Sequence, residues 1–346
     1  MREKKKRSRY FLILIMTVVL ILSSCQKKDV TTQIVFTTGL RRNELLKIEN
    51  VICSKAEGSL LLVNTKNKYE EAFGEEIWKQ QIDGISFETY VKDMVKNQMG
   101  QLKCMSFYAQ EENIVLSEEK KAAIEQAASL YFQELTEEEK EGLDITQEDI
   151  EQIYTDYAVA EELYEYLTKD VEEEISDAEA KVIVVQHIYK DTTNLTEEEK
   201  QNAYQTMEKI EQNLKETDAD FNYLAQEYSD DSKIEYIFGR GEMDIAFEEA
   251  AFALEQGEIS DIVESSSGYH IIKCINDYDM ERTNSNKKTV LEKRKREAFD
   301  AVYAKFIKNL LTEFNQKVWD KMKIEDYKEM HNNNLYEVYQ QNVQVE

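Results

Sequence analysis

The sequence predicts an α+β protein made of a mostly helical lobe and a smaller domain that mixes strands with helices. Between residues 65 and 175, apolar side chains recur at steps of three and four, as in helices that bury one face. We expect Ser117, Thr136 and Thr146 to begin helices in this region, whereas the short apolar runs 34–36 and 60–63 before it are strand-like or buried. Two short β-branched segments, 181–189 and 269–275, enclose shorter helical stretches and read as strands. A long helix over about 288–323 carries an apolar stripe. Because a lone helix cannot bury such a stripe, we expect it to pack on the helical lobe.

The first 24 residues have the features of an export signal. A basic head precedes the apolar run from Phe11 to Leu22, whose twelve residues fall short of the roughly 20 that cross a bilayer. The run ends in Leu22-Ser23-Ser24-Cys25, which resembles a bacterial lipobox. The resemblance implies that Cys25 carries a diacylglycerol anchor and becomes the mature N-terminus, on the outer face of the cell membrane. An ordinary secretory signal with a chance cysteine is the alternative.

The chain is strongly acidic. Its formal net charge is −27, and removal of the leader, with six basic residues and one acidic residue, leaves −32. Nucleic-acid binding requires a basic surface that displaces counterions, so the charge argues against polyanionic partners. It also keeps the protein off anionic lipid, except through the expected anchor.

The remaining cysteines do not predict a metal site. Cys53, Cys104 and Cys274 form no CxxC pair and no cluster with histidine, so we expect neither a zinc site nor thioredoxin-like chemistry. Buried free thiols are the favoured reading, because unpaired cysteine packs as a small hydrophobic residue. A disulfide between Cys53 and Cys104 stays open, since sequence does not report their distance.

The stretch from Phe221 to Lys273 carries the most specific pattern. It contains Ser-Asp-Asp at 229–231, Phe-Gly-Arg-Gly-Glu-Met at 238–243, Gly-Glu-Ile-Ser at 257–260 and Gly-Tyr-His-Ile-Ile-Lys at 268–273. This order and spacing resemble the parvulin family of peptidyl-prolyl cis/trans isomerases. The resemblance implies an FKBP-like α+β domain with an antiparallel sheet, and it implies isomerase activity without a cofactor.

Two of the three histidines fall where parvulins keep an active-site pair. By the resemblance, His187 and His270 lie on adjacent central strands and share a hydrogen bond that shapes the floor of the pocket. Asp231 falls where the family carries Cys or Asp beside the rotating amide. Taken singly, each histidine would be read as a satisfied core residue and Asp231 as a turn residue. Their joint occurrence inside the motif favours the catalytic interpretation.

Four more positions are implied to bind substrate. Met243 and Phe247 match the apolar pair that packs on the proline ring, and Ser265 and Ser267 match small polar positions near the second histidine. Outside the motif, Met243 and Phe247 would be ordinary core residues. The segment 233–237 is a loop several residues shorter than its parvulin counterpart, which usually supplies an apolar wall residue. Ile234 or Ile237 is expected to replace that residue here.

The layout of the whole chain resembles the PrsA-like foldase lipoproteins and, more distantly, the SurA-like chaperones. It implies a signal peptide over 1–24, a mostly helical chaperone-like region over 25–176 and a parvulin domain over 177–277. A C-terminal helix over 286–325 would complete the N-terminal lobe, and 326–346 reads as a polar tail.

The resulting prediction is a membrane-anchored extracytoplasmic foldase that isomerises X-Pro bonds in newly exported, unfolded proteins. The alternative is a holdase chaperone whose parvulin domain has lost catalysis. A solute-binding lipoprotein is disfavoured, because paired α/β lobes are not indicated. A homodimer is left open.

Overall fold

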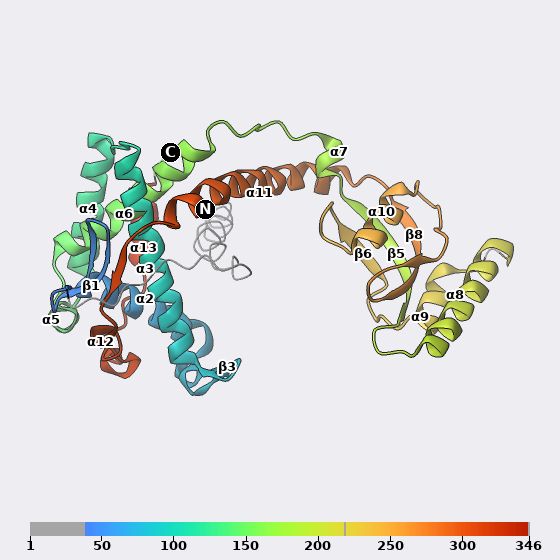
Figure 1. Cartoon of the computed structure of the whole chain (residues 1–346), viewed down its shortest axis with the longest axis horizontal. Coiled ribbons are helices and arrows are strands. Elements are labelled where there is room, and N and C mark those ends of the chain that lie inside the picture. The colour runs from blue at the N-terminus through green and yellow to red at the C-terminus, as the bar shows by residue number, and fades with distance from the viewer. Residues whose placement is uncertain (1–38, 218, 345–346) are drawn as a thin grey trace. The chain divides into compact units, whose positions relative to one another are not determined.

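The computed structural model describes residues 39–217 and 219–344 of the 346-residue chain. The export signal, Cys25 and the apolar run at 34–36 lie outside the described residues. The chain divides into two compact units (Figure 1). Unit 1 joins the chain up to Lys169 with the segment from Ala298 onward, and unit 2 spans Asp170–Glu297.

Unit 1 is mostly helical, as predicted for residues 65–175. From the N-terminal side it contains β1 (Glu44–Ile48), β2 (Val51–Ser54), α2 (Lys55–Phe73), the 3-10 helix η2 (Glu75–Lys79), the two-residue strands β3 (Gln81–Ile82) and β4 (Ile85–Ser86), α3 (Phe87–Glu111), α4 (Glu118–Glu134), α5 (Glu137–Leu143) and α6 (Gln147–Thr168). The capping residues Thr136 and Thr146 begin α5 and α6, each with a reciprocal capping box.

The apolar run Leu60–Val63 was expected to be strand-like or buried. It is buried, but it lies within α2 and not in a strand. Ser54 begins this helix with a capping box to Glu57, and the helix then crosses the core of unit 1. A helix that is surrounded by other elements shows a continuous apolar run, which periodicity alone does not separate from a buried strand.

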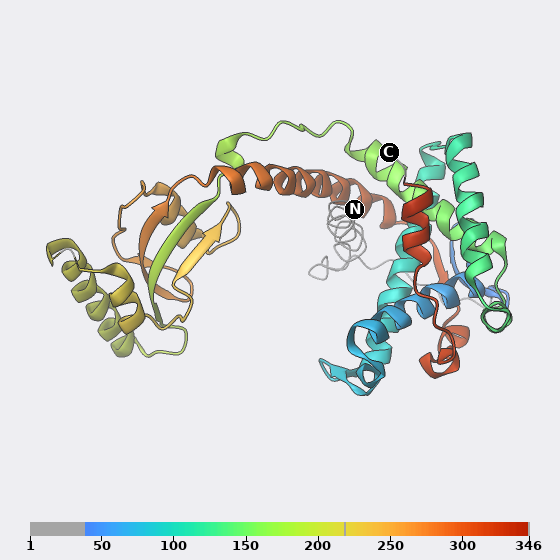
Figure 2. The ribbon, with the colours of Figure 1, turned by 180° about the vertical axis from the view of Figure 1, so that it is seen from behind.

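The C-terminal part of the chain completes unit 1. It consists of the end of α11 (Met280–Ile307), β9 (Thr312–Phe314), α12 (Gln316–Trp319), the 3-10 helix η3 (Ile324–Tyr327) and α13 (Leu335–Asn342). Strand β9 pairs antiparallel with β1, so that the sheet order is β2-β1-β9. Phe306 of α11 stacks on Tyr108 of α3, with ring centroids 3.8 Å apart. In both Figure 1 and Figure 2, α13 lies beside α4 and α6.

Two expectations for this region were wrong. The helix expected to run to residue 323 ends at Ile307, because residues 312–314 pair with β1 as a strand and turn Thr312 and Phe314 inward. Leu310 and Phe314 are four residues apart, a spacing that fits one face of a helix and also one face of a strand. The sequence therefore does not decide between the two, and pairing with the free edge of β1 selects the strand. The segment 326–346 is not a polar tail, since its described part contains α13 and contributes Leu335 and Tyr339 to the core.

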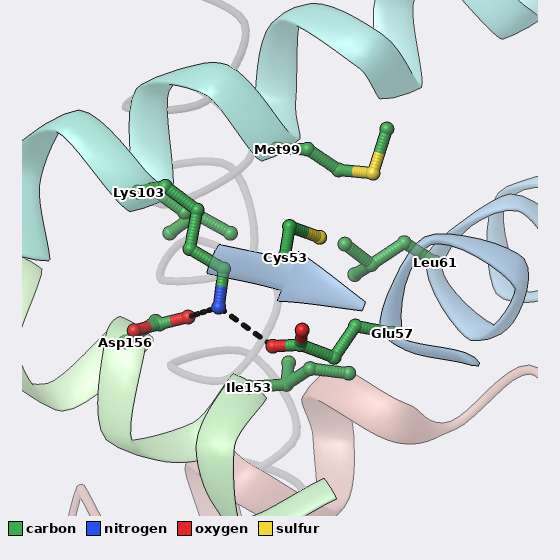
Figure 3. A pocket seen from close by; sticks show the side chains of 8 residues that line it. Cys53, Glu57, Leu61, Met99, Lys103, Ile153 and Asp156 are labelled. Carbon is green, nitrogen blue, oxygen red and sulfur yellow. Dashed lines mark hydrogen bonds and ion pairs between the residues drawn. The ribbon is translucent and has the colours of Figure 1, made fainter. Parts of the chain in front are cut away.

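A buried ion network joins three elements of unit 1 (Figure 3). The Lys103 ammonium group of α3 lies 2.6 Å from Glu57 Oε1 of α2 and 2.6 Å from Asp156 Oδ2 of α6. Burial opposes the charge on Lys103, but the carboxylates of Asp156 and Glu57 outweigh it and raise the lysine pKa. Burial raises the pKa of Glu57. A buried charge is tolerated only when it is paired, so this network requires α2, α3 and α6 to meet in one arrangement.

Unit 2 is built on a four-stranded antiparallel sheet of order β6-β5-β8-β7. Its elements are α7 (Asp177–Ala180), β5 (Ile183–Asp191), α8 (Glu197–Thr217), α9 (Phe221–Tyr228), β6 (Glu235–Phe238), α10 (Ile245–Ala253), β7 (Val263–Glu264), β8 (Gly268–Asn276) and the first part of α11. Helices α8 and α9 cover one face through Ile188 and Ile271, and α10 covers the other through Val185 and Ile272 (Figure 1). The predicted order of strand, three helices and strand is confirmed, with the short strands β6 and β7 in addition.

Cys53, Cys104 and Cys274 are all buried free thiols. Burial raises the pKa of each thiol. Within the part of the chain that the structure describes, no helix combines the length and the apolar character needed to cross a bilayer.

We predict that Tyr339→Ala destabilises unit 1 by about 3–5 kcal/mol, the usual cost of removing a buried aromatic ring. Tyr339 is fully buried, its ring lies 5.4 Å from that of Tyr154, and its hydroxyl group donates to Glu161. Urea unfolding followed by tryptophan fluorescence measures the effect, because both tryptophans, Trp78 and Trp319, belong to unit 1.

Tyr166→Ala is the matched control, because this tyrosine of α6 is 38% exposed. It should cost less than about 1 kcal/mol. Equal effects of the two substitutions would contradict a structural role for α13.

Candidate functional site

The pairing of β5 with β8 brings the two predicted histidines together. In the register of this pair, His187 lies opposite Ile272, and Tyr189 lies opposite His270. The histidines are therefore diagonal neighbours on one face of the sheet, because side chains two apart on a strand share a face. This is the face that packs on α10. Both histidines are buried, with 4% of His187 and 7% of His270 exposed.

Five side chains form one hydrogen-bonded chain across this face. His187 Nδ1 lies 3.3 Å from His270 Nδ1, and His187 Nε2 lies 3.2 Å from Asp231 Oδ2. At one end of the chain, the Tyr236 hydroxyl group donates to Asp231 Oδ2 over 2.6 Å. At the other end, Ser265 Oγ lies 2.8 Å from His270 Nε2. The predicted hydrogen bond between the histidines is present, and Asp231, Tyr236 and Ser265 extend it on both sides.

The direction of this chain follows from the charge on Asp231. An ionised carboxylate only accepts hydrogen bonds, so His187 donates from Nε2 and must accept at Nδ1. His270 then donates from Nδ1 and accepts at Nε2, where the nearest donor is the Ser265 hydroxyl group. All four ring nitrogens are thus engaged within the chain while both imidazoles are neutral. This arrangement therefore does not prepare either imidazole to transfer a proton to a substrate.

The electrostatics agree with neutral histidines beside an ionised aspartate. Burial lowers the pKa of His187, and the Asp231 carboxylate offsets only part of that effect. Burial, followed by the neighbouring His187, lowers the pKa of His270 to about 4. For Asp231, burial would raise the pKa, but hydrogen bonds from Tyr236 and from the Lys233 amide, together with His187, outweigh it and lower the pKa.

The two predicted apolar residues differ in what they offer. Phe247 is 1% exposed, and its ring meets those of His187 and His270 edge-on, with centroids 5.7 and 5.0 Å apart. It therefore supports the histidines from within the core. Met243 is only partly buried and packs on the same core. Of the predicted pair, Met243 is the one that offers surface to a ligand in this structure.

The predicted serines lie in the tight turn between β7 and β8. Ser265 accepts hydrogen bonds from the amides of Ser267 and Gly268, which leaves its proton for His270. Ser267 accepts at its carbonyl group from the Tyr189 hydroxyl group, and the Tyr189 ring stacks on His270 at 4.8 Å. Gly268 is required here, because a Cβ atom at this position would lie 1.9 Å from the Lys190 carbonyl oxygen.

Tyr236 is the residue of this site that the sequence interpretation missed. The short segment 233–237 was read as a loop, with Ile234 or Ile237 as its apolar wall. It instead forms most of β6, which pairs with β5 and sets Tyr236 opposite Val185. Ile237 is 42% exposed and Ile234 packs with the core on the opposite face of the sheet, so neither forms the wall. Alternation of Tyr236 with Phe238 was the available signal.

Comparison with known proteins identifies the class of this domain. Residues 187–276 match the rotamase family described as the PPIC-type PPIASE domain. Residues 187–276 thus form a parvulin-type rotamase domain, as the motif predicted.

Relatives extend the similarity beyond the domain. The foldase protein PrsA of Caldanaerobacter subterraneus is 28% identical over 78% of this chain and 82% of that protein. The PrsA protein of Bacillus subtilis is 43% identical over 20% of this chain and 25% of its own length. The peptidyl-prolyl cis-trans isomerase ESS1 of Saccharomyces cerevisiae is 53% identical over 16% of this chain and 35% of its own length. The last two matches are thus confined to about a third or less of those proteins.

We predict that acid weakens unit 2 through its buried histidines. Their folded-state pKa values lie below the unfolded value of about 6.5. The unfolded chain therefore binds more protons as the pH falls, so the histidine contribution is complete above pH ~6.5 and is lost toward pH ~4. With a pKa of about 4, His270 alone accounts for about 2 kcal/mol between pH 7.5 and pH 5.

Urea unfolding at several pH values, followed by NMR signals of unit 2, measures this dependence. The control is His331→Gln, which alters an exposed histidine of unit 1 and should leave the dependence unchanged. Stability of unit 2 that stays constant or increases from pH 7.5 to pH 5 would contradict the prediction.

Proposed function

We propose that this chain is a membrane-anchored extracytoplasmic foldase that catalyses cis/trans isomerisation of X-Pro bonds in exported proteins. The observation that carries the proposal is the hydrogen-bonded chain through the buried His187 and His270, which ends at the partly exposed Asp231 carboxylate. The similarity to proteins named foldase over most of the chain supports the wider role.

The chemistry requires no nucleophile. Rotation about an X-Pro amide has a barrier of about 20 kcal/mol, because the twisted amide loses its C–N resonance. The planar amide places partial negative charge on its carbonyl oxygen, and twisting withdraws that charge. An ionised Asp231 beside the carbonyl group would therefore disfavour the planar state relative to the twisted one.

The remaining residues would act by holding the substrate and this carboxylate in place. The buried histidine pair forms a rigid floor that engages its own hydrogen-bonding groups, so it does not compete for those of the substrate. Met243 would pack against the proline ring, and Ser265 and Ser267 would line the side next to His270. Phe247 supports the floor from behind.

The isomerase activity is tested with a proline-containing peptide whose cis and trans forms are distinguished in a coupled or NMR assay. His270→Ala should lower kcat/KM by roughly tenfold or more, since it breaks the hydrogen-bonded chain between His187 and Ser265. Asp231→Cys should be tolerated better than Asp231→Lys, because a cation beside His187 would reverse the polarity of this end of the chain. Circular dichroism of each variant controls for folding. Wild-type activity equal to background would contradict the proposal.

Anchoring is tested separately at Cys25. The motif Leu22-Ser23-Ser24-Cys25 directly follows a short apolar run, so Cys25→Ala should release the protein from the membrane fraction or leave its leader uncleaved. Cell fractionation and the mass of the mature protein measure this. Unchanged membrane retention together with an unchanged mass would rule out lipidation at Cys25.

A non-catalytic holdase is the second candidate, and one observation favours it. Phe247 is 1% exposed, which leaves little apolar surface on which a proline ring could pack. Suppression of client aggregation by a protein without isomerase activity would support the holdase. Activity that depends on His270 would exclude it as the sole function.

A further inference from the structure

The short segment between Asp231 and β6 brings Tyr236 next to Asp231 and His187. Strand β6 sets Tyr236 opposite Val185 of β5, two positions before His187. The tyrosine ring meets the His187 ring edge-on, with centroids 5.0 Å apart, and the Lys233 ammonium group lies 4.2 Å from the centre of the tyrosine ring. His187 and Lys233 thus hold the tyrosine ring on two sides.

The Tyr236 hydroxyl group makes the shortest link of the hydrogen-bonded chain, at 2.6 Å to Asp231 Oδ2. The same oxygen accepts from His187 over 3.2 Å, while Oδ1 accepts from the Lys233 amide over 2.8 Å. The Asp231 side chain is 26% exposed, so water competes for it. With Tyr236 in place, both carboxylate oxygens are held in one orientation.

We propose that Tyr236 is a positioning residue of this site, whose hydroxyl group holds the Asp231 carboxylate against His187 and thereby sets the direction of the whole hydrogen-bonded chain. The inference rests on the proposed isomerase function for its catalytic consequence. Its structural content, a tyrosine that acts through Asp231 on His187, does not depend on that function.

Groups from β5, from β6 and from its own turn face the Asp231 carboxylate. His187 approaches from β5, with His270 of β8 behind it, and Tyr236 approaches from β6. Within its own turn, Lys233 contributes its amide, and the neighbouring Asp230 forms an ion pair with Lys190. Among these groups, the Tyr236 hydrogen bond contributes most to lowering the Asp231 pKa against burial.

Removal of this hydroxyl group should therefore raise the pKa of Asp231. Burial and the hydrogen bond to Asp231 raise the pKa of Tyr236 to about 12, so the tyrosine remains a donor throughout the range in which the carboxylate titrates. A protonated Asp231 can donate a hydrogen bond to His187 Nε2 as well as accept one from it. The donor and acceptor assignments of the two histidines are then no longer fixed. The acid limb of the activity profile should then shift to higher pH.

The test is Tyr236→Phe in the full-length protein, which keeps the ring and removes only the hydroxyl group. We expect kcat/KM on a proline-containing peptide to fall roughly tenfold at neutral pH, the effect of one lost charge-assisted hydrogen bond. We also expect the acid limb to move upward. In the same variant, the carboxyl carbon NMR signal of Asp231 should titrate at a higher pH than in the wild type.

Tyr278→Phe is the matched control. The hydroxyl group of Tyr278 also donates to an aspartate of unit 2, at 2.9 Å from Asp177 Oδ2, but away from the histidines. This substitution should leave the activity, the acid limb and the Asp231 titration unchanged. In an Asp231→Asn background, Tyr236→Phe should have a much smaller effect than in the wild type, because the two residues act through one contact.

The outcomes separate this inference from the proposed function. A wild-type protein without isomerase activity would defeat the proposed function, while the NMR titration would still test Tyr236. An active wild type whose acid limb and Asp231 titration are unchanged by Tyr236→Phe would overturn the positioning role. Unfolding of Tyr236→Phe would also overturn it, since the hydroxyl group would then be holding the fold and not the carboxylate.

Discussion

The antiparallel pairing of β5 with β8 is the constraint on which unit 2 and its site depend. His187 and His270 are 83 positions apart along the chain, and only this register makes them diagonal neighbours on one face. A shift by one residue would move one histidine to the opposite face, where Ile188 and Ile271 pack under α8 and α9. The turn at Gly268 protects the register, because no side chain fits against the Lys190 carbonyl group there.

Each unit buries a network of polar side chains that are hydrogen-bonded to one another. In unit 1, Lys103 is held between Glu57 and Asp156, so the buried charges are paired. In unit 2 the histidines stay neutral, and the ionised end of their chain, Asp231, is partly exposed. The first arrangement specifies how three helices meet. The second arrangement combines a rigid, uncharged floor with one charge that a ligand can reach.

The sequence predicted most of the site and misjudged its edges. His187, His270, Asp231 and Ser265 were expected together, and all four lie in one hydrogen-bonded chain. Their motif is local in sequence apart from His187, which the opening strand identified. Tyr236 was missed because its segment was too short to show a clear strand period, and pairing with β5 decided its conformation. The complete burial of Phe247 was not predicted either, because a match to a motif position does not determine how exposed the side chain is.

The sequence by itself determined the class of each unit, the helix starts at Ser117, Thr136 and Thr146, and the placement of two histidines on two strands. These features follow from periodicity, capping chemistry and a motif, which act over a few residues. Only the tertiary structure decided that residues 312–314 join β1 as a strand and that α13 enters the core of unit 1. The same holds for the contact between Tyr236 and Asp231. In each case the local sequence pattern allows more than one conformation. The partner that selects one of them belongs to a distant element, which comes alongside only when the chain folds.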